Sequence, residues 1–166
     1  MTNSGDDHVK VLFRYHSNVL DEVTVETMWA IKVDEKNGIY KLDSIPFYGP
    51  EIASDDEFFA EYDESEEMIT YRKTTKYSGN SIVLVSISND EINKEEIRED
   101  FKTLNCVSEG LNDYYFSMEI LATTDYSMIK NRLEQYETQG LIDYAEPCLS
   151  EKHRSDLNNQ NTEKFK

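Results

Sequence analysis

The sequence predicts an α+β protein in which a curved antiparallel β-sheet precedes a β-α-β-β-α-β unit. Short runs rich in β-branched and aromatic residues, separated by Gly, Pro and Asn, fill residues 9–80. Over residues 81–149 the hydrophobic period changes, and two segments with helical spacing alternate with apolar strands. The length of 166 residues fits one domain or two very small ones. We expect subdomains at 9–80 and 81–149, followed by a polar tail at 150–166 that is mobile or at best a short helix.

The first half is expected to form five strands, at residues 9–15, 23–33, 39–44, 57–63 and 69–73. One face of the second strand carries Val23, Val25, Thr27, Trp29 and Ile31. We therefore expect Trp29, like Phe47, to lie in the core. The residues Lys36-Asn37-Gly38 predict a tight turn, because Asn and Gly tolerate a positive φ. Strands this short and closely spaced predict a small, strongly curved sheet or barrel.

The second half is expected to contain strands at 81–87, 106–108, 114–122 and 141–149, and helices at 93–104 and 125–139. Ile97, Phe101 and Leu104 fall on one helical face, and Asn93 is a candidate N-cap. This order matches the ferredoxin-like arrangement, in which two helices cover one face of a four-stranded antiparallel sheet. The second and fourth strands are then opposite edges, so Cys106 and Cys148 should lie far apart and unbonded.

The charge of the chain limits its partners. It has 17 Lys and Arg against 34 Asp and Glu, a net charge of −17. Nucleic acids and anionic membranes are bound by clustered basic residues, so neither is expected as a partner. The apolar runs are too short to span a bilayer, and residues 1–10 have no signal-peptide core. We therefore expect a cytoplasmic protein.

No motif in the sequence indicates catalysis, a metal or a cofactor. His8, His16 and His153 have no metal-ligand spacing to one another or to Cys or Asp. Neither cysteine has a neighbouring His or a basic environment that would activate a thiol. Phosphate-binding glycine loops and the GxSxG motif are absent. We therefore predict a protein that is not an enzyme, with no catalytic residue, metal site or cofactor.

The most pronounced feature is an acidic run that no Lys or Arg interrupts until Arg72. Its carboxylates are Asp55, Asp56, Glu57, Glu61, Asp63, Glu64, Glu66 and Glu67. One interpretation is a solvated loop that keeps the protein soluble. The functional interpretation is a surface that attracts a cationic protein, with Phe59 or Tyr62 as aromatic anchor. A Ca²⁺ site is a third interpretation, but EF-hand spacing is absent.

A second acidic patch falls on the first predicted helix. It comprises Asp90, Glu91, Glu95, Glu96, Glu99 and Asp100, interleaved with Lys94 and Arg98. Several of these residues form like-charge pairs at i, i+4, which slightly destabilise a helix. The patch is either a solvated helix face or the next candidate for a binding surface.

The first half resembles a bacterial family known as domain of unknown function 4265. The resemblance covers about residues 9–62 and is carried by 11–13 (VLF), 25–30 (VETMWA), 38–48 (GIYKLDSIPFY) and the acidic start of the next strand at 55–60. It implies a bacterial origin and an SH3-like small barrel, and it implies no activity. In size and charge the chain is also similar to bacterial immunity proteins, which neutralise toxins.

Two functions are consistent with these observations. The leading hypothesis is an immunity protein that occludes the active or substrate-binding surface of a basic toxin domain, through electrostatic capture and steric blocking. The alternative is a regulatory module whose ferredoxin-like part binds a small molecule, which rests on fold analogy alone.

Overall fold

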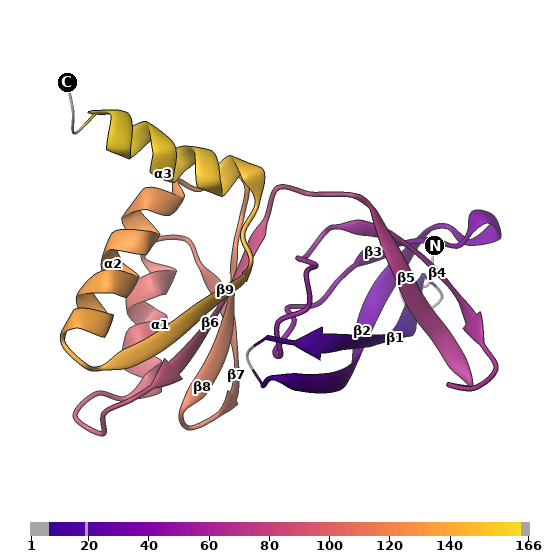
Figure 1. The fold of residues 1–166 in the computed structure, drawn as a ribbon, viewed down its shortest axis with the longest axis horizontal. Helices are drawn as coiled ribbons and strands as arrows, with labels where there is room; N and C mark the ends of the chain where they lie inside the picture. The colour runs from indigo at the N-terminus through magenta and orange to yellow at the C-terminus, as the bar shows by residue number, and fades with distance from the viewer. Residues whose placement is uncertain (1–6, 19, 164–166) are drawn as a thin grey trace.

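The structure, a computed structural model, describes residues 7–18 and 20–163 and consists of two β-sheets and three α-helices (Figure 1). The first sheet is a closed barrel of five strands, and the second has four strands in the order β7-β8-β6-β9. The strands are β1 His8–Ser17, β2 Glu22–Asp34, β3 Ile39–Leu42, β4 Glu57–Asp63, β5 Met68–Lys76, β6 Ser81–Ile87, β7 Val107–Asn112, β8 Tyr115–Ile120 and β9 Ile142–Cys148. The helices are the 3₁₀ turn η1 Glu35–Asn37, α1 Lys94–Lys102, α2 Tyr126–Thr138 and α3 Glu151–Glu163. Among the described residues, no helix is long and apolar enough to cross a bilayer.

The barrel follows the predicted run of short strands, and its neighbouring strands are antiparallel except where it closes. There β1 pairs with β5 in parallel, with Leu12 opposite Thr70. Its interior is aromatic: the ring of Phe13 stacks on Tyr71 at 5.0 Å and meets the edge of Phe58 at 5.4 Å. These ring contacts fill the centre of the small barrel.

The prediction that Trp29 lies in the core is wrong. Trp29 is 49 % exposed, and the inward face of β2 is the other one, with Met28 and Ala30 buried. The interior is already filled by aromatic rings from β1, β4 and β5, so it accepts small or flexible side chains from β2. Phe47, also expected in the core, is half-buried.

The turn before β3 is tight for a steric reason. Gly38 has φ +73°, and a Cβ at this position would lie 2.8 Å from the carbonyl oxygen of Ala60. Glycine therefore supplies both the left-handed conformation and the room for β4 to approach.

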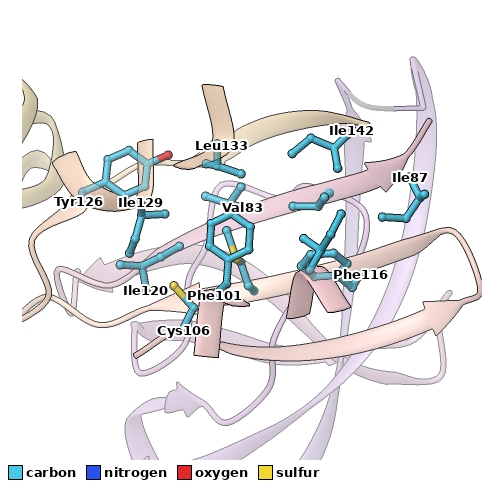
Figure 2. Packing of buried hydrophobic residues seen from close by; sticks show 13 residues of the cluster. Val83, Ile87, Phe101, Cys106, Phe116, Ile120, Tyr126, Ile129, Leu133 and Ile142 are labelled. Carbon is cyan, nitrogen blue, oxygen red and sulfur yellow. The ribbon is translucent and has the colours of Figure 1, made fainter. Parts of the chain in front are cut away.

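Helices α1 and α2 pack on one face of the second sheet, the face turned away from the barrel (Figure 1). Figure 2 shows the core between them, where Phe101 of α1 and Ile129 and Leu133 of α2 lie over residues of the sheet. From β8 the alternate residues Phe116, Met118 and Ile120 are all fully buried within this core.

The predicted helix starts are also confirmed. The side chain of Asn93 accepts a hydrogen bond from the backbone N–H of Glu95, and that of Asp125 accepts one from Ser127. Strand β7 is longer than the strand expected at 106–108, since it extends to Asn112. Cys106 precedes one edge strand and Cys148 ends the other, and both are free.

The tail, predicted to be mobile or at best a short helix, contains a helix of 13 residues. Residues Glu151–Glu163 form α3, which lies across one end of α2 (Figure 1). His153 anchors α3 and is fully buried, with its ring 5.5 Å from the ring of Tyr126. His153 thus fixes a mostly polar helix together with Asp156, which accepts a hydrogen bond from the N–H of Tyr126, and Leu157, which packs against the core.

The two sheets meet through a segment of the barrel half. Ile45 and Ala53 pack against Ile82 and Leu84 on the face of the second sheet that the helices leave uncovered. The predicted division of the chain near residue 80 falls in the connection between β5 and β6, and it stays a prediction.

Candidate partner-binding surfaces and the cleft between the sheets

The acidic run lies on β4 and the turn into β5, where strand pairing brings basic side chains beside it. Arg72 of β5 contacts Glu61 at 3.1 Å and Asp63 at 2.8 Å. Arg14 of β1 donates to both carboxylate oxygens of Glu66, at 2.8 and 3.0 Å. A run that is continuous in the sequence is therefore broken by ion pairs in the fold.

The remaining members of the run differ in exposure. Glu57 lies 3.6 Å from Lys76. Asp55, Glu64 and Glu67 are exposed, and no cation among the described residues pairs with them. Only these three keep an uncompensated charge that a partner can meet.

Asp56 must be removed from the proposed binding surface. It is 1 % exposed, and its carboxylate accepts hydrogen bonds from the N–H of Ala53 at 3.0 Å and from the N–H and hydroxyl of Ser78 at 2.8 and 2.9 Å. Burial raises the pKa of Asp56, and the hydrogen bonds counteract only part of that effect. Its role is to join the loop before β4 to the connection between the two sheets.

The two proposed aromatic anchors, Phe59 and Tyr62, also differ in exposure to solvent. Phe59 is half-buried, and its ring packs against Gly38. Tyr62 is 62 % exposed. Of the two, Tyr62 is the one that a partner can reach.

In the second acidic patch, the two cations of α1 contact both Glu95 and the backbone of the neighbouring strand β7. Lys94 donates to the carbonyl oxygen of Asn112 at 2.7 Å, and Arg98 donates to that of Ser108 at 2.8 Å. Gly110 makes room for both, because a Cβ there would lie 2.5 Å from the Lys94 ammonium nitrogen. Backbone carbonyls of β7 therefore hold the basic side chains against the sheet edge.

Exposed carboxylates of α1 and of the turn before it form the outer surface here. Glu91, Glu96 and Glu99 are exposed, and none pairs with a cation among the described residues. Glu95 lies 3.1 Å from Arg98, which also donates to the backbone of β7. This group, which we call the α1 acidic surface (Glu91, Glu95, Glu96 and Glu99), is less neutralised than the acidic run.

Asp100 faces the other way, toward α2. Burial acts to raise its pKa, but hydrogen bonds from Arg132 and Tyr136 outweigh burial and lower it overall. The Arg132 contact is 2.5 Å and that of Tyr136 is 2.6 Å. Asp100 thus links the two helices and is not part of the α1 acidic surface.

One Ser–His pair resembles a catalytic dyad in distance but not in access. The Ser81 hydroxyl lies 2.6 Å from Nδ1 of His153, and Nε2 of His153 lies 3.0 Å from the carbonyl oxygen of Leu121. Both side chains are fully buried, and burial lowers the pKa of His153. The pair therefore fastens α3 to β6, and a substrate cannot reach it.

Neither thiol is poised for nucleophilic chemistry. Burial raises the pKa of both Cys106 and Cys148 to about 12, so each is protonated at neutral pH. Among the described residues, no three His, Cys, Asp or Glu side chains are grouped to hold a metal ion.

A cleft of about 580 Å³ lies where the barrel, the connection to β6 and the start of α3 meet. Tyr77, Asn80, Cys148 and Arg154 are among its lining residues. Its volume lies within the range of small-molecule pockets, and junctions between structural units are common places for them.

A buried carboxylate holds the barrel to the segment that contacts the second sheet. Glu26 is 8 % exposed and accepts hydrogen bonds from the N–H of Phe47 at 2.7 Å and the hydroxyl of Tyr15 at 2.9 Å. Tyr115 of β8 donates to the carbonyl oxygen of Phe47. Burial raises the pKa of Glu26 despite these hydrogen bonds. Glu26 and Phe47 both belong to the segments that carry the family resemblance, and their contact is structural.

One further surface, the outer face of β1 and β2, was not predicted from the sequence. Val23, Val25 and Trp29 are exposed on β2, and Lys10 of β1 lies over the Trp29 ring at 5.2 Å. Two features of the sequence point to this orientation. Ala30 is small enough for a narrow barrel interior, and the alternate positions of β1 are basic.

Residues 26–144 match the family described as "Domain of unknown function (DUF4265)". The chain belongs to this family. The DUF4265 match extends well beyond the first-half resemblance, through α1 and α2 into β9. A search of curated proteins found no match.

Among solved structures, the chain is similar to one titled "Novel crystal structure of a hypothetical protein from Neisseria gonorrhoeae". The TM-score is 0.73 with 20 % sequence identity, over 86 % of this chain and 95 % of that one. At this identity the likeness shows a shared fold for this DUF4265 protein and carries no statement about function.

Proposed function

We propose that this DUF4265 protein is a non-enzymatic binding protein of the immunity type, which covers the active or substrate-binding surface of a basic bacterial toxin domain in the cytoplasm. The observation that carries the proposal is the α1 acidic surface, whose carboxylates stay exposed because Lys94 and Arg98 are bound to β7. Such a surface speeds the approach of a cationic protein and rejects acidic ones.

The surface expected from the sequence contributes less to this function. In the acidic run, Asp56 is buried and Glu61, Asp63 and Glu66 are paired with arginines. We assign the run a secondary role, through Asp55, Glu64, Glu67 and the exposed ring of Tyr62.

The test uses the protein encoded immediately upstream, whose C-terminal domain is co-expressed with the DUF4265 protein in a growth assay. We expect that domain to be basic and toxic, and we expect the DUF4265 protein to restore growth. Neutralising Glu91, Glu96 and Glu99 to Gln should slow association at low salt by roughly tenfold, because steering depends on summed charge. The matched control changes the paired acids Glu57, Glu61 and Asp63 to Gln or Asn, which alters the net charge equally. Equal rates for both triple variants, or an upstream gene without a toxic product, would contradict the proposal.

The cleft between the sheets supports a second candidate function, a regulatory module that binds a small molecule. The order β7-β8-β6-β9, with both helices on one face, supports a ferredoxin-like assignment, and the five short strands support an SH3-like assignment for the barrel. Ligand-observed NMR with a fragment library would test this candidate. Fragments that bind the parent and lose binding when Tyr77 and Arg154 are changed to Ala would favour it over toxin occlusion.

A further inference from the structure

We propose that the outer face of β1 and β2 docks a second protein, whose contact surface is apolar and carries carboxylates at its rim. This surface is separate from the α1 acidic surface, and its partner has the opposite charge preference. The proposal therefore does not depend on the immunity function.

The first observation is that the residues that β1 and β2 themselves place on this face include no acid. The register of the two strands places ten residues on this side of the sheet, of which Leu12 alone is buried: His8, Lys10, Leu12, Arg14, His16, Val23, Val25, Thr27, Trp29 and Ile31. Because 34 of the 166 residues are acidic, ten positions would carry about two carboxylates by composition alone. These ten carry none, in a protein with a net charge of −17.

The second observation is the exposure of the apolar side chains. Val23 is 65 % exposed, Val25 42 % and Trp29 49 %, and Val33 continues the row at 49 %. They stand on one 13-residue strand that pairs with β1 from Glu22 to Ile31 and with β3 only from Ala30 to Asp34, so pairing with β1 holds the part that carries Val23 and Val25. Exposed Trp beside basic side chains on a rigid support is the composition of protein-binding hot spots.

The charge of the face indicates the partner. His8 pairs with Asp43, Arg14 with Glu66 and His16 with Asp21, all acids from outside the two strands. Lys10 differs from these three. It lies over the Trp29 ring, and no carboxylate within the described part of the chain pairs with it. A carboxylate of the partner beside Lys10 would give it the ion pair that His8, Arg14 and His16 already have within the protein.

Two other occupants fit less well. In a symmetric dimer the same face meets itself, so the cations of β1 and the total charge of both copies would repel. RNA binding needs several uncommitted cations along a backbone path, whereas Lys10 alone is without a carboxylate partner here. The row of valines offers nothing that a phosphate or base would select.

The experiment uses Trp29, the single Trp of the chain, as a built-in fluorescent reporter of this face. The full-length protein is titrated with two synthetic 12-residue peptides, one alternating Leu and Glu and the other alternating Leu and Lys. We expect the Glu peptide to shift the Trp29 emission to the blue in a saturable way and to bind at least about tenfold more tightly than the Lys peptide. Polyuridylate and a protein dilution series without peptide are run in parallel.

Variants separate the face from the rest of the molecule. Lys10→Glu should reverse the preference between the peptides, whereas Lys102→Glu, an equal charge change at an exposed site on α1, should leave it unchanged. Val25→Ser should weaken binding several-fold, and Val23→Ser, at the more exposed position, serves if that variant fails to fold. The α1 variants Glu91→Gln, Glu96→Gln and Glu99→Gln should not affect this titration, which separates it from the immunity test.

Four results would overturn the proposal. They are equal binding of the two peptides, identical responses of Lys10→Glu and Lys102→Glu, a saturable response to polyuridylate, and a concentration-dependent blue shift without peptide. The third would assign the face to RNA, and the fourth to a second copy of the chain.

Discussion

Asp56 and Asp55 are adjacent carboxylates with opposite environments, and changing each to Asn should give opposite results. Asp56 is 1 % exposed and accepts three hydrogen bonds, whereas Asp55 is exposed. The left-handed φ of +65° at Asp55 is one that Asn also tolerates. We expect Asp56→Asn to lower the free energy of unfolding and Asp55→Asn to leave it within about 0.5 kcal/mol of the parent.

The size of the loss follows from the donors around Asp56. An Asn that keeps its oxygen toward Ser78 turns its amide toward the N–H of Ala53, which then has no acceptor in a buried place. An unsatisfied buried donor costs about 1–3 kcal/mol. Removing a charge that burial disfavours offsets part of this cost, so the net loss should be about 1–2 kcal/mol. Asp56→Ala, which removes every acceptor, should cost about 2–4 kcal/mol.

Urea unfolding measures the free energy of unfolding of the parent and of the Asp55 and Asp56 variants. Circular dichroism and Trp29 emission monitor the transition, and the emission reports on the barrel. The pH dependence gives a separate check. Because the folded state raises the pKa of Asp56 above its ordinary value of 3.8, its contribution to stability is complete below that value and declines as pH rises through the raised pKa. The difference between parent and Asp56→Asn should follow that course. Equal losses for the Asp55 and Asp56 variants, or a difference that does not vary with pH, would refute the structural role assigned to Asp56.

Three further outcomes are expected. Burial lowers the pKa of His153 below its ordinary value of 6.5. The stability that His153 contributes is therefore complete above pH 6.5 and is lost as the pH falls through the lowered pKa. Between pH 7.5 and 5.5, urea unfolding should show a smaller change in the free energy of unfolding for His153→Gln than for the parent. Gly38→Ala should cost more than Gly140→Ala by at least about 1 kcal/mol in thermal unfolding, because both have φ +73° but only Gly38 has a backbone oxygen 2.8 Å from the added Cβ; equal costs would contradict the close approach. Cys106 and Cys148 should resist a thiol reagent at pH 8 in the folded protein and react in urea, and rapid labelling of the folded protein would contradict their raised pKa values.

The local signals in the sequence were sufficient for the second sheet and insufficient for the orientation of β2. Helix caps such as Asn93 and Asp125 act over two residues, so they can be identified without knowing the fold. Which face of a strand is buried depends on the volume left inside by other strands. For β2 the rings of Phe13, Phe58 and Tyr71 occupy that volume, and the bulky Trp29 is left outside. The most apolar face of a strand is therefore a poor guide to the core when the barrel is small and its other strands are aromatic.

The same distinction explains why the acidic run was overestimated and α1 underestimated. Arg14 lies 52 residues from Glu66 in the sequence. Arg72 follows the run directly but contacts Glu61 and Asp63 through the pairing of β4 with β5, so the sequence does not show which acids the two arginines neutralise. In α1 the interleaved Lys94 and Arg98 suggested that the helix neutralises its own carboxylates, but backbone carbonyls of β7 bind both cations. The one residue in the sequence that indicates this contact is Gly110, which leaves room for the two side chains. The number of charges along a segment therefore indicates the charge of a surface only where strand pairing brings no opposite charge to it and no neighbouring strand binds its ions. On that ground, neutralising the α1 acidic surface should alter association with a cationic partner more than neutralising an equal number of acids in the run.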